Sequence, residues 1–551
     1  SLLFTSNIKM SSIYSLRQFV EKDLKFQEYL LKTHPMFASC KDLVAEISEL
    51  QFDQMFWEFI LKSDDSPFNS KFLQDGLELE NSIDVSSFVN GSAFAKLGDD
   101  LQTIKFNMAN KSTSSSELDS SSASNTPSPQ NGLTNLNTLQ FATTEMSTNV
   151  VKEALNPWNL HNLPILPNSL FGVLGENDIN NQDIYTPTVN VGMTFSTENW
   201  RAEDHFANLC DYHVFGAPKK WFFIPELEFD KFEVLLNEVS VNEKRLHINN
   251  NDWNAKSLLN SLPDQWTFES EAFTSLIESI VPPYSDYNNN RSRHSNQRFQ
   301  SLIDYQRKSR QQNSLSDIVV SYNQDCFVTP EQLKAAGIKH YKCVQNPGEI
   351  IVKFPKSYSA TVSMGLNLSE QVNFVTCNWL HYALEAENWL NKQLLIPNFL
   401  IFKLLVLLAQ LLESNAGVVP EISYDSKVFA KALKLYEELL EKELDLRSRI
   451  KKLNLKEISI DEAVDSDTIS DDDLLNTYPS RVSLLDTKSG QKMFVSLKNY
   501  LHYIDIKNPV VEDPTIKAEL QYFCSEDKLR HFEKLLKGFS VDYEKWMSNY
   551  E

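Results

Sequence analysis

Apolar residues near the start of the chain recur every three or four positions, which is the spacing of an amphipathic helix. The pattern covers residues 11–62, in segments such as SLRQFVEKDLKFQEYLL and LVAEISELQFDQMFWEFI. It returns over Tyr382–Leu412 and Ser426–Leu453, and the last helical pattern covers Ser525–Tyr550. The charged residues of Ser426–Leu453 suit a side that faces solvent. Helices are therefore predicted in both end regions of the chain.

The middle of the chain carries shorter runs rich in β-branched and aromatic residues, which are typical of strands. We expect strands around Val189–Thr197, Tyr212–Pro225, Glu349–Tyr358 and Gln371–Leu380. Strands grouped between helical regions indicate an α+β class.

Two polar stretches interrupt these patterns. Asn110–Leu139, NKSTSSSELDSSSASNTPSPQNGLTNLNTL, has too few large apolar residues to pack and is predicted to be a disordered insertion. Tyr284–Ser314 contains NNNRSRHSNQRFQ and further Arg and Gln residues. We interpret it as a solvated loop, with contact to nucleic acid or to an acidic partner as the alternative.

Length and composition narrow the class of protein. At 551 residues with 42% hydrophobic content, the chain can form two or three domains. Its six cysteines form no C-x-x-C pair, which argues against a zinc module and a secreted disulfide framework and favours a reducing compartment. The net charge of −22 disfavours a major DNA-binding surface but is compatible with basic partners such as histone tails. The chain begins with Ser and shows no signal peptide, so we expect it to be cut from a longer protein.

One apolar run approaches the length of a membrane span. Leu394–Leu412, LLIPNFLIFKLLVLLAQLL, is interrupted by Pro397, Asn398, Lys403 and Gln410. Because a lysine at mid-bilayer is costly, a buried helix is the better interpretation.

The candidate chemistry lies in two motifs. The first is Trp-Arg-Ala-Glu-Asp-His at 200–205, and it resembles the metal-binding strand of JmjC domains in the JARID family of histone H3 lysine-4 demethylases, where His-x-Glu precedes Asp-His. The position of the first histidine is Arg201, whereas the carboxylate is kept as Glu203. The second is NPGEIIVKFPKSYSATVSMGLNLSEQVNFVTCNWL at Asn346–Leu380, which resembles the family's later strands and has Ser359 at the second histidine position.

The replacements at positions 201 and 359 affect whether the chain can bind Fe(II). Non-haem Fe(II) oxygenases use two imidazoles and one carboxylate, and arginine offers no lone pair to a metal. Residues two apart on a strand point to the same side, so Arg201 and Glu203 are expected to form an ion pair inside the barrel. The sequence therefore predicts no metal ligand set and no catalytic residue.

The pocket for 2-oxoglutarate is also altered. The run Gly-Ala-Pro-Lys-Lys-Trp at 216–221 resembles the family's and keeps its lysine as Lys219. An aromatic of the family is replaced by Glu198, and an asparagine by Asp211. Because two added carboxylates oppose a doubly negative cosubstrate, we expect Lys219 to be a structural partner for these acids.

Two histidines near the motif invite a metal interpretation. His205 matches a histidine that family members carry without using it as a ligand, and His213 falls where they have an apolar residue. Structural roles are expected for both, since replacement ligation needs several donors converging on one point. The sequence shows no P-loop, Gly-rich dinucleotide fingerprint or G-x-S-x-G elbow.

The resemblance implies a JmjC double-stranded β-helix, or jelly roll, with flanking helices and a C-terminal helical domain. Tyr478–His502 resembles the family's zinc module without its cysteines, with a hairpin turn at Ser489-Gly490, so structural zinc is expected to be absent. The expected division of the chain is a helical lead-in at 1–108, the Ser-rich insertion at 109–150, the jelly roll at 151–381 with the polar insertion at 284–314, a helical domain at 382–477, and the degenerate zinc-module hairpin and terminal helix at 478–551.

The functional hypothesis is a nuclear pseudo-demethylase that binds neither Fe(II) nor 2-oxoglutarate and acts as a scaffold in a chromatin complex. The resemblance, closest to fungal proteins with degenerate JmjC domains, implies histone deacetylase and PHD-type reader subunits as partners. One alternative is a dioxygenase with unconventional ligands, in which Glu203 and donors such as His205 or His213 bind the metal and Lys219 holds the cosubstrate. Another is a histone-tail binder that uses Glu198, Glu203 and Asp211 without catalysis.

Overall fold

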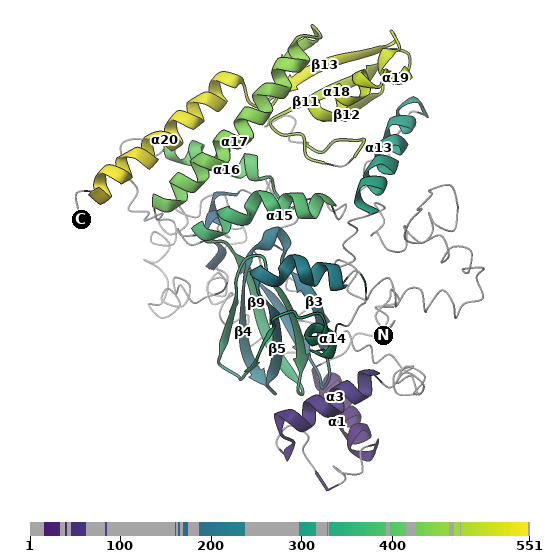
Figure 1. Cartoon of the computed structure of the whole chain (residues 1–551), viewed down its shortest axis with the longest axis vertical. Coiled ribbons are helices and arrows are strands. Elements are labelled where there is room, and N and C mark those ends of the chain that lie inside the picture. The colour runs from purple at the N-terminus through teal and green to yellow at the C-terminus, as the bar shows by residue number, and fades with distance from the viewer. Residues whose placement is uncertain are drawn as a thin grey trace, which may run out of the picture.

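Figure 1 shows the computed structural model of the chain. The Ser-rich stretch at 109–150 and residues 284–296 of the second insertion lie outside the described residues. The structure describes residues 16–33, 39–40, 46–61, 83–84, 160, 163–165, 169–174, 184, 187–236, 238, 297–315, 328, 330–392, 397–414, 426–461, 468–473 and 475–548.

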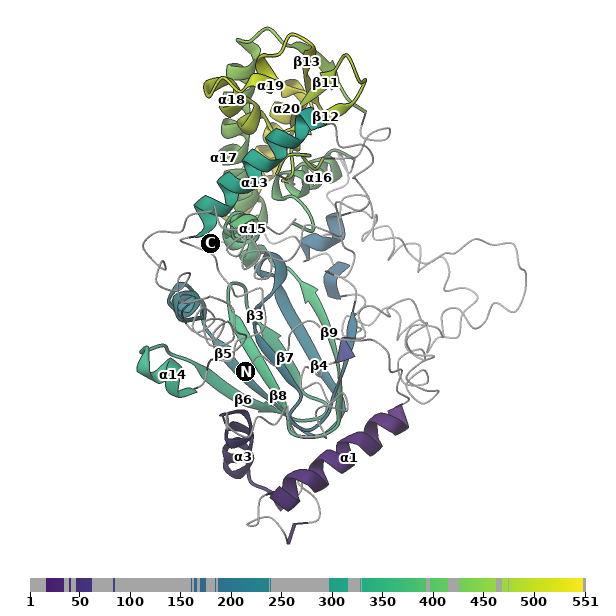
Figure 2. The ribbon, with the colours of Figure 1, turned by 90° about the vertical axis from the view of Figure 1, so that its right-hand side faces the viewer.

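Two antiparallel sheets face each other in the middle of the molecule (Figure 2). One has the order β1-β2-β9-β4-β7 and the other β3-β8-β5-β6. The side chain of Lys219 in the second sheet reaches Asp211 in the first, so polar groups from both sheets meet inside the barrel. The strands are β1 (Ile83–Asp84), β2 (Thr188–Gly192), β3 (Thr197–Ala202), β4 (Asn208–Gly216), β5 (Lys219–Ile224), β6 (Tyr341–Gln345), β7 (Ile350–Lys353), β8 (Tyr358–Ser363) and β9 (Asn367–Phe374).

The strands expected from the sequence lie within this barrel, but their limits differ. The run Tyr212–Pro225 contains the end of β4 and all of β5, separated by a turn at Gly216 with φ of +105°. A Cβ at Gly216 would lie 2.2 Å from the carbonyl oxygen of Leu366, so this turn requires glycine. The sequence patterns did not resolve β6 or β8, and β3 was placed on a strand only by the resemblance of residues 200–205.

Two N-terminal helices close one end of the barrel, α1 (Leu16–Thr33) and α3 (Glu49–Leu61) (Figure 2). Phe195 inserts its ring among three phenylalanines of these helices, with edge-on geometry at 5.2–5.8 Å between ring centroids. On the neighbouring strand, the buried Lys220 forms ion pairs with Glu49 and Asp53 of α3. Apolar packing and charge pairing therefore both hold the helical lead-in to the barrel.

A layer of four helices covers the other end: α15 (Leu380–Lys392), α16 (Ile401–Ser414), α17 (Ser426–Lys451) and α20 (Glu526–Ser548). The single pattern expected over Tyr382–Leu412 is two helices, α15 and α16, with Pro397 in the segment between them. The apolar run once weighed as a membrane span forms α16, where Ile401, Leu405 and Ala409 are fully buried in the helical core. Among the described helices, none combines the length and apolarity that crossing a bilayer requires.

The C-terminal part adds a second small sheet of order β10-β13-β11-β12. The hairpin expected around Ser489-Gly490 is confirmed, since β11 and β12 pair across that turn. Strand β10, from the part of the chain assigned to the helical domain, pairs with β13 of this sheet, and α20 packs with α16 and α17. The elements of this module are β10 (Lys456–Ser459), β11 (Ser480–Asp486), β12 (Lys492–Val495), β13 (Ile516–Tyr522), α18 (Leu497–Asp505) and α19 (Pro509–Glu512).

The second polar insertion was expected to be a solvated loop, and for its latter half this expectation is wrong. Residues Gln297–Leu315 form helix α13, which packs against the C-terminal module (Figure 1). Phe299 and Leu302 are buried in the core of that module, and Arg298 forms ion pairs with Asp486 and Asp513. Two well-placed apolar residues and one arginine are enough to dock a helix whose other residues are mostly polar.

The remaining short elements connect the barrel to its surroundings. They are η4 (Leu163–Ile165), η5 (Leu170–Val173), η8 (Asp204–Phe206), η9 (Glu226–Glu228), the helical segment 229–236, α14 (Pro330–Ala335) and η11 (Cys377–Trp379).

Candidate functional site

The three positions expected to have held a metal come together at the end of the barrel that faces α15. Arg201 of β3 is the register partner of Ser359 on β8, and Glu203 follows the end of β3. A guanidinium nitrogen of Arg201 lies 3.2 Å from the Glu203 carboxylate, so the expected ion pair is confirmed. Glu203 is buried, whereas the Arg201 side chain is 31% exposed.

A second cation, which the sequence analysis did not single out, also contacts Glu203. The ammonium of Lys353, at the end of β7, lies 3.2 Å from the Glu203 carboxylate and donates a hydrogen bond to the Arg201 carbonyl at 2.9 Å. Asn373 on β9 donates to the other carboxylate oxygen at 2.9 Å. The Glu203 carboxylate is therefore bound by two cations and one amide.

The electrostatics of this cluster follow from burial and charge. Burial by itself raises the pKa of Glu203, but Arg201 and Lys353 more than offset it and bring the pKa to about 2. Burial lowers the pKa of Lys353 to about 8, against the opposing effect of Glu203. At neutral pH the carboxylate is ionised, and the buried ammonium is matched by it.

These residues do not fit the Fe(II) site of a non-haem oxygenase. Such a site needs two imidazoles and one carboxylate with open positions for the other ligands. Arg201 has no lone pair to offer, and the only strong donor of the three, Glu203, already binds two positive charges that would repel a divalent cation.

A second buried polar cluster surrounds Lys219, deeper between the sheets. Its ammonium lies 3.2 Å from Asp211 and 3.1 Å from the Ser369 hydroxyl, and 5.0 Å above the ring of Trp221. Asp211 also accepts hydrogen bonds from Gln371 at 2.6 Å and from Gln345 at 2.9 Å. The expectation that Lys219 is a structural partner is confirmed for Asp211.

Glu198, the other acid expected near Lys219, has a different partner. It accepts a hydrogen bond from Asn190 on the neighbouring part of the barrel at 3.1 Å. The three acids proposed to hold a basic tail therefore have partners within the chain: Asn190 for Glu198, two cations for Glu203, and Lys219 for Asp211.

His205 and His213 have structural contacts. His205 stacks on Phe399 at 4.0 Å between ring centroids, and its Nε2 accepts the amide hydrogen of Asn398 at 3.0 Å. Burial lowers the pKa of His205 to about 3, so the ring is neutral. Nε2 of His213 donates to the Ala217 carbonyl at 2.7 Å across the β4–β5 turn. Within the described ranges, no group of three or more His, Cys, Asp or Glu side chains could hold a metal ion.

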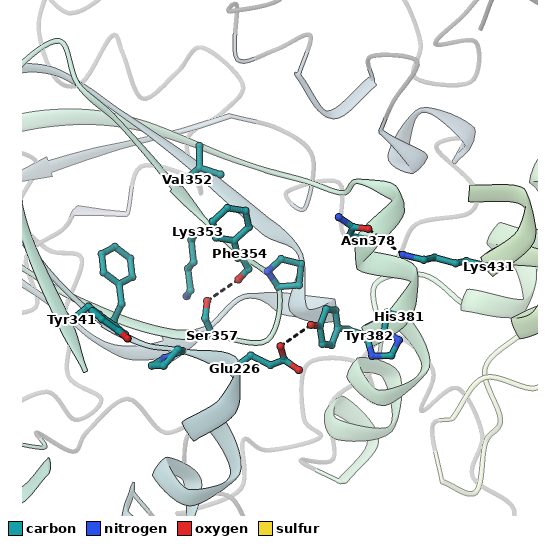
Figure 3. A pocket seen from close by; sticks show the side chains of 13 residues that line it. Glu226, Tyr341, Val352, Lys353, Phe354, Ser357, Asn378, His381, Tyr382 and Lys431 are labelled. Atoms are coloured by element: carbon teal, nitrogen blue, oxygen red, sulfur yellow. Dashed lines mark hydrogen bonds between the residues drawn. The ribbon is translucent and has the colours of Figure 1, made fainter. Parts of the chain in front are cut away.

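A pocket of about 650 Å³ opens beside the cluster of Arg201, Glu203 and Lys353. It lies between β5, β6 and β7 and the helices α15 and α17 (Figure 3). Phe223 is the register partner of both Ser359 and Tyr341, which places the pocket next to the former ligand positions. Lys353 forms part of its lining. The other lining residues are Phe223, Pro225, Glu226, Tyr341, Val352, Phe354, Pro355, Ser357, Asn378, His381, Tyr382 and Lys431.

Comparison with known proteins identifies the barrel. Residues 188–272 and 292–374 match the family described as JmjC domain, hydroxylase. The barrel of this chain is a JmjC domain. Both clusters lie inside the matched ranges, and the α+β jelly roll expected from the resemblance is confirmed.

The JmjC chain is also similar to longer curated proteins. It is 28% identical over 273 residues to Protein ECM5 of Saccharomyces cerevisiae, which is 49% of this chain and 18% of that protein. It is 27% identical over 237 residues to the lysine-specific demethylase JMJ703 of Oryza sativa subsp. japonica, covering 42% of this chain and 13% of the relative. The lysine-specific demethylase rbr-2 of Caenorhabditis briggsae is 24% identical over 305 residues, which is 55% of this chain and 15% of that protein.

The sequence pattern around Lys353 could have indicated its buried position, but the resemblance directed attention to the expected ligand positions. It is the one charged residue in the run Ile350-Ile351-Val352-Lys353, and its neighbours in β7 alternate between the inside and the outside of the barrel. A lysine at an inward position of such a strand needs a buried acid, which Glu203 supplies. Only the register of β7 against β4 brings the two residues together.

Proposed function

We propose that this JmjC protein is a catalytically inactive relative of the 2-oxoglutarate-dependent demethylases and acts as a scaffold in a chromatin-modifying complex. The observation that carries the proposal is the pairing of Glu203 with both Arg201 and Lys353. Metal binding would require the carboxylate to exchange two matched charges for a divalent ion without the support of imidazole ligands.

The Lys219 cluster supports the same proposal for the cosubstrate. For Lys219 to bind a carboxylate of 2-oxoglutarate, it would have to leave Asp211 and Ser369. Asp211 would then remain buried as an anion beside the incoming anion, which is unfavourable in a low-dielectric interior. We therefore infer that neither Fe(II) nor 2-oxoglutarate is a cofactor, and that the hairpin module carries no structural zinc.

The setting of the scaffold is also part of the proposal. Two of the relatives described above are named lysine-specific demethylases, and the chain aligns with 13–18% of the lengths of all three. We infer a nuclear protein, with histone deacetylase and PHD-type reader subunits as partners, as the family resemblance implies.

Calorimetric titration with Mn(II) or Ni(II), with and without 2-oxoglutarate, tests the loss of the oxygenase site. We expect no specific binding in either condition, and any weak heat should persist unchanged in Glu203→Gln. Metal binding that 2-oxoglutarate strengthens and Glu203→Gln abolishes would instead support a dioxygenase with unconventional ligands.

Purification of the full-length protein from nuclear extract tests the scaffold role. We expect histone deacetylase activity and a PHD-containing subunit to co-purify in fixed proportion. Glu203→Gln, which removes a charge inside the barrel without changing its surface, should leave this association intact. A protein that purifies without either subunit would contradict the proposed partnership.

A further inference from the structure

Exposed apolar side chains gather on one part of the barrel. Eleven large apolar side chains are exposed among the described residues, and four of them lie on β6, β7 and the residue that follows β7. They are Tyr341, Ile350, Val352 and Phe354, with exposed fractions of 61, 37, 45 and 72%. Residues 350, 352 and 354 alternate along an extended segment, so their side chains form a stripe on one face. Clusters of this kind on a soluble protein mark interaction surfaces.

Two hollows meet at Tyr341, and the first of them also borders the stripe at Val352 and Phe354. One is the pocket beside Lys353 described above, and the other, of about 680 Å³, lies between α14 and the start of β6. Figure 3 shows Tyr341 and Phe354 on opposite sides of the first pocket, with Tyr382 and His381 closing it from α15. The lining of the second hollow is Pro330, Glu331, Lys334, Gly337, Ile338, Lys339, His340 and Tyr341.

The charge of this surface differs from that of the whole chain. Lys353 is matched by Glu203, which leaves Lys334, Lys339 and Lys431 against Glu226 and Glu331 in the linings, together with two histidines. The chain as a whole has 52 Lys and Arg against 74 Asp and Glu. A surface that is locally basic on an acidic protein favours an acidic partner.

The strands also favour an occupant in extended conformation. Among the described strands, β7 is the edge of one sheet and β6 the edge of the other. An extended peptide can follow such edges, placing alternate side chains in pockets.

From these observations we propose that the Tyr341–Phe354 surface, defined as the four exposed side chains and the two hollows, binds an extended acidic peptide of a partner protein. Apolar side chains of the peptide occupy the pocket between Tyr341 and Phe354. Its carboxylates lie against Lys334, Lys339 and Lys431. The inference rests on the proposed scaffold function. It specifies which kind of partner segment binds at this end of the barrel.

A basic histone tail fits this surface poorly. Of the acids expected to hold such a tail, Glu203 and Asp211 are buried and paired with lysines or arginine inside the barrel. At the rim, a basic peptide would meet Lys431 and Lys334 instead. Juxtaposed like charges suppress binding of the wrong partner.

Selection of random short peptides displayed on phage against the 551-residue chain tests the proposal. We expect the enriched peptides to combine Asp or Glu with Leu, Phe or Trp, and the affinity of a labelled representative to be measurable by fluorescence anisotropy. Val352→Ser with Phe354→Ser should weaken that affinity about tenfold or more, because both side chains would lie under the peptide. Lys334→Glu with Lys431→Glu should weaken it to a similar extent, and the effect of added salt should fall.

Matched controls separate a local effect from a general one. Leu24→Ser replaces another exposed apolar residue on α1, and Lys498→Glu reverses an exposed charge on α18. Neither should change the affinity, and all variants should keep the melting temperature of the wild type because the changed side chains are at the surface.

Several outcomes would overturn the proposal. These are enrichment of basic peptides, no enrichment at all, or an affinity that Val352→Ser with Phe354→Ser leaves unchanged. Self-association that the same double change abolishes would assign the surface to a second copy of the chain instead. The metal titrations do not depend on this surface, so failure of the peptide experiment is distinguishable from failure of the proposed loss of catalysis.

Discussion

The ammonium of Lys353 lies 3.2 Å from the carboxylate of Glu203; Lys353 ends β7 of one sheet, and Glu203 follows β3 of the other. The carboxylate is the residue that a JmjC oxygenase would use to bind a metal ion. Here a lysine of the same chain supplies the positive charge, assisted by Arg201. A buried carboxylate without a counter-charge would be costly, so the lysine stabilises the ionised form of Glu203.

Replacing Lys353 with Met tests this relationship. The change keeps most of the side-chain volume but leaves Glu203 with Arg201 as its only cation. Breaking a buried pair on one side costs about 3 kcal/mol of unfolding free energy. Urea denaturation followed by fluorescence measures this loss.

The double variant Lys353→Met with Glu203→Gln supplies the control. If the two residues act as a pair, the double change should cost less than the sum of the single changes, by about 1–3 kcal/mol. Additive losses would mean that the two side chains are energetically independent, contrary to the contact described.

Reintroducing the missing histidines should not restore metal binding while Lys353 remains. In Arg201→His with Ser359→His, the ammonium still lies at the Glu203 carboxylate, where it opposes a divalent ion. We expect little or no binding of Mn(II) by this double variant and no turnover of a histone H3 peptide. Adding Lys353→Thr should raise the affinity for Mn(II) by about tenfold or more, because one repulsive charge is removed.

The same series separates metal binding from catalysis. The triple variant should still fail to bind 2-oxoglutarate, since Lys219 remains paired with Asp211. Paramagnetic broadening of the Mn(II) signal reports metal binding, and calorimetry reports the cosubstrate. Demethylation by the double variant alone would contradict both arguments.

Part of this site was predictable because it depends on local geometry. Arg201 and Glu203 are two residues apart on a strand, so their pairing follows from the alternation of side chains. Lys219 and Asp211 lie on adjacent strands joined by a short turn, and the motif that contains Lys219 indicated its inward position. Lys353 could not be placed in the same way, because its contact with Glu203 depends on how β7 pairs with β4 at the edge of their sheet.

In the C-terminal region, too, local structure was predictable from the sequence and long-range packing was not. The hairpin of β11 and β12 is local and was predicted, whereas the partners of α20 and α13 were not. The helix α13 in particular is rich in Arg, Gln and Ser, and its composition is that of a loop. Phe299 and Leu302 hold this segment as a docked helix, because they pack against the apolar core of the C-terminal module, whose residues are distant in the sequence.

The pH dependence of stability should include a contribution from Glu233. Its carboxylate accepts hydrogen bonds from Trp389 at 2.5 Å and from Tyr358 at 2.9 Å, and burial raises its pKa to about 7 from an ordinary value of 4.5. The folded state therefore holds a proton that the unfolded state releases between these values. The unfolding free energy should fall as the pH rises from about 4.5 to 7, by a contribution on the order of 3 kcal/mol.

Glu233→Gln removes this contribution while it keeps an oxygen that can accept a hydrogen bond. The variant should be more stable than the wild type at pH 8, and the difference should vanish or reverse near pH 5. Denaturant unfolding at a series of pH values provides the measurement. Glu441→Gln, at an exposed position of α17, should leave the profile unchanged. Burial also raises the pKa of Glu387 to about 7. Both variants should therefore keep part of the decrease in unfolding free energy with rising pH.

Docking of α13 to the C-terminal module should depend on its apolar residues more than on its ion pairs. Leu302 is fully buried in the core of the module, and replacing a buried leucine with alanine costs about 2–5 kcal/mol. Arg298 is 34% exposed, so Arg298→Ala should cost only about 0.5–1 kcal/mol in spite of its two ion pairs. Ser301 is exposed on the same helix, and Ser301→Ala should be neutral or slightly stabilising because alanine favours the helix.

Hydrogen exchange of the backbone amides at 300–306 ranks the three variants by how far each one weakens the docking of α13. If α13 is held as described, exchange accelerates most in Leu302→Ala and least in Ser301→Ala, whereas the barrel strands keep their protection. Equal rates in the wild type and in Leu302→Ala would mean that the helix is not held by this contact.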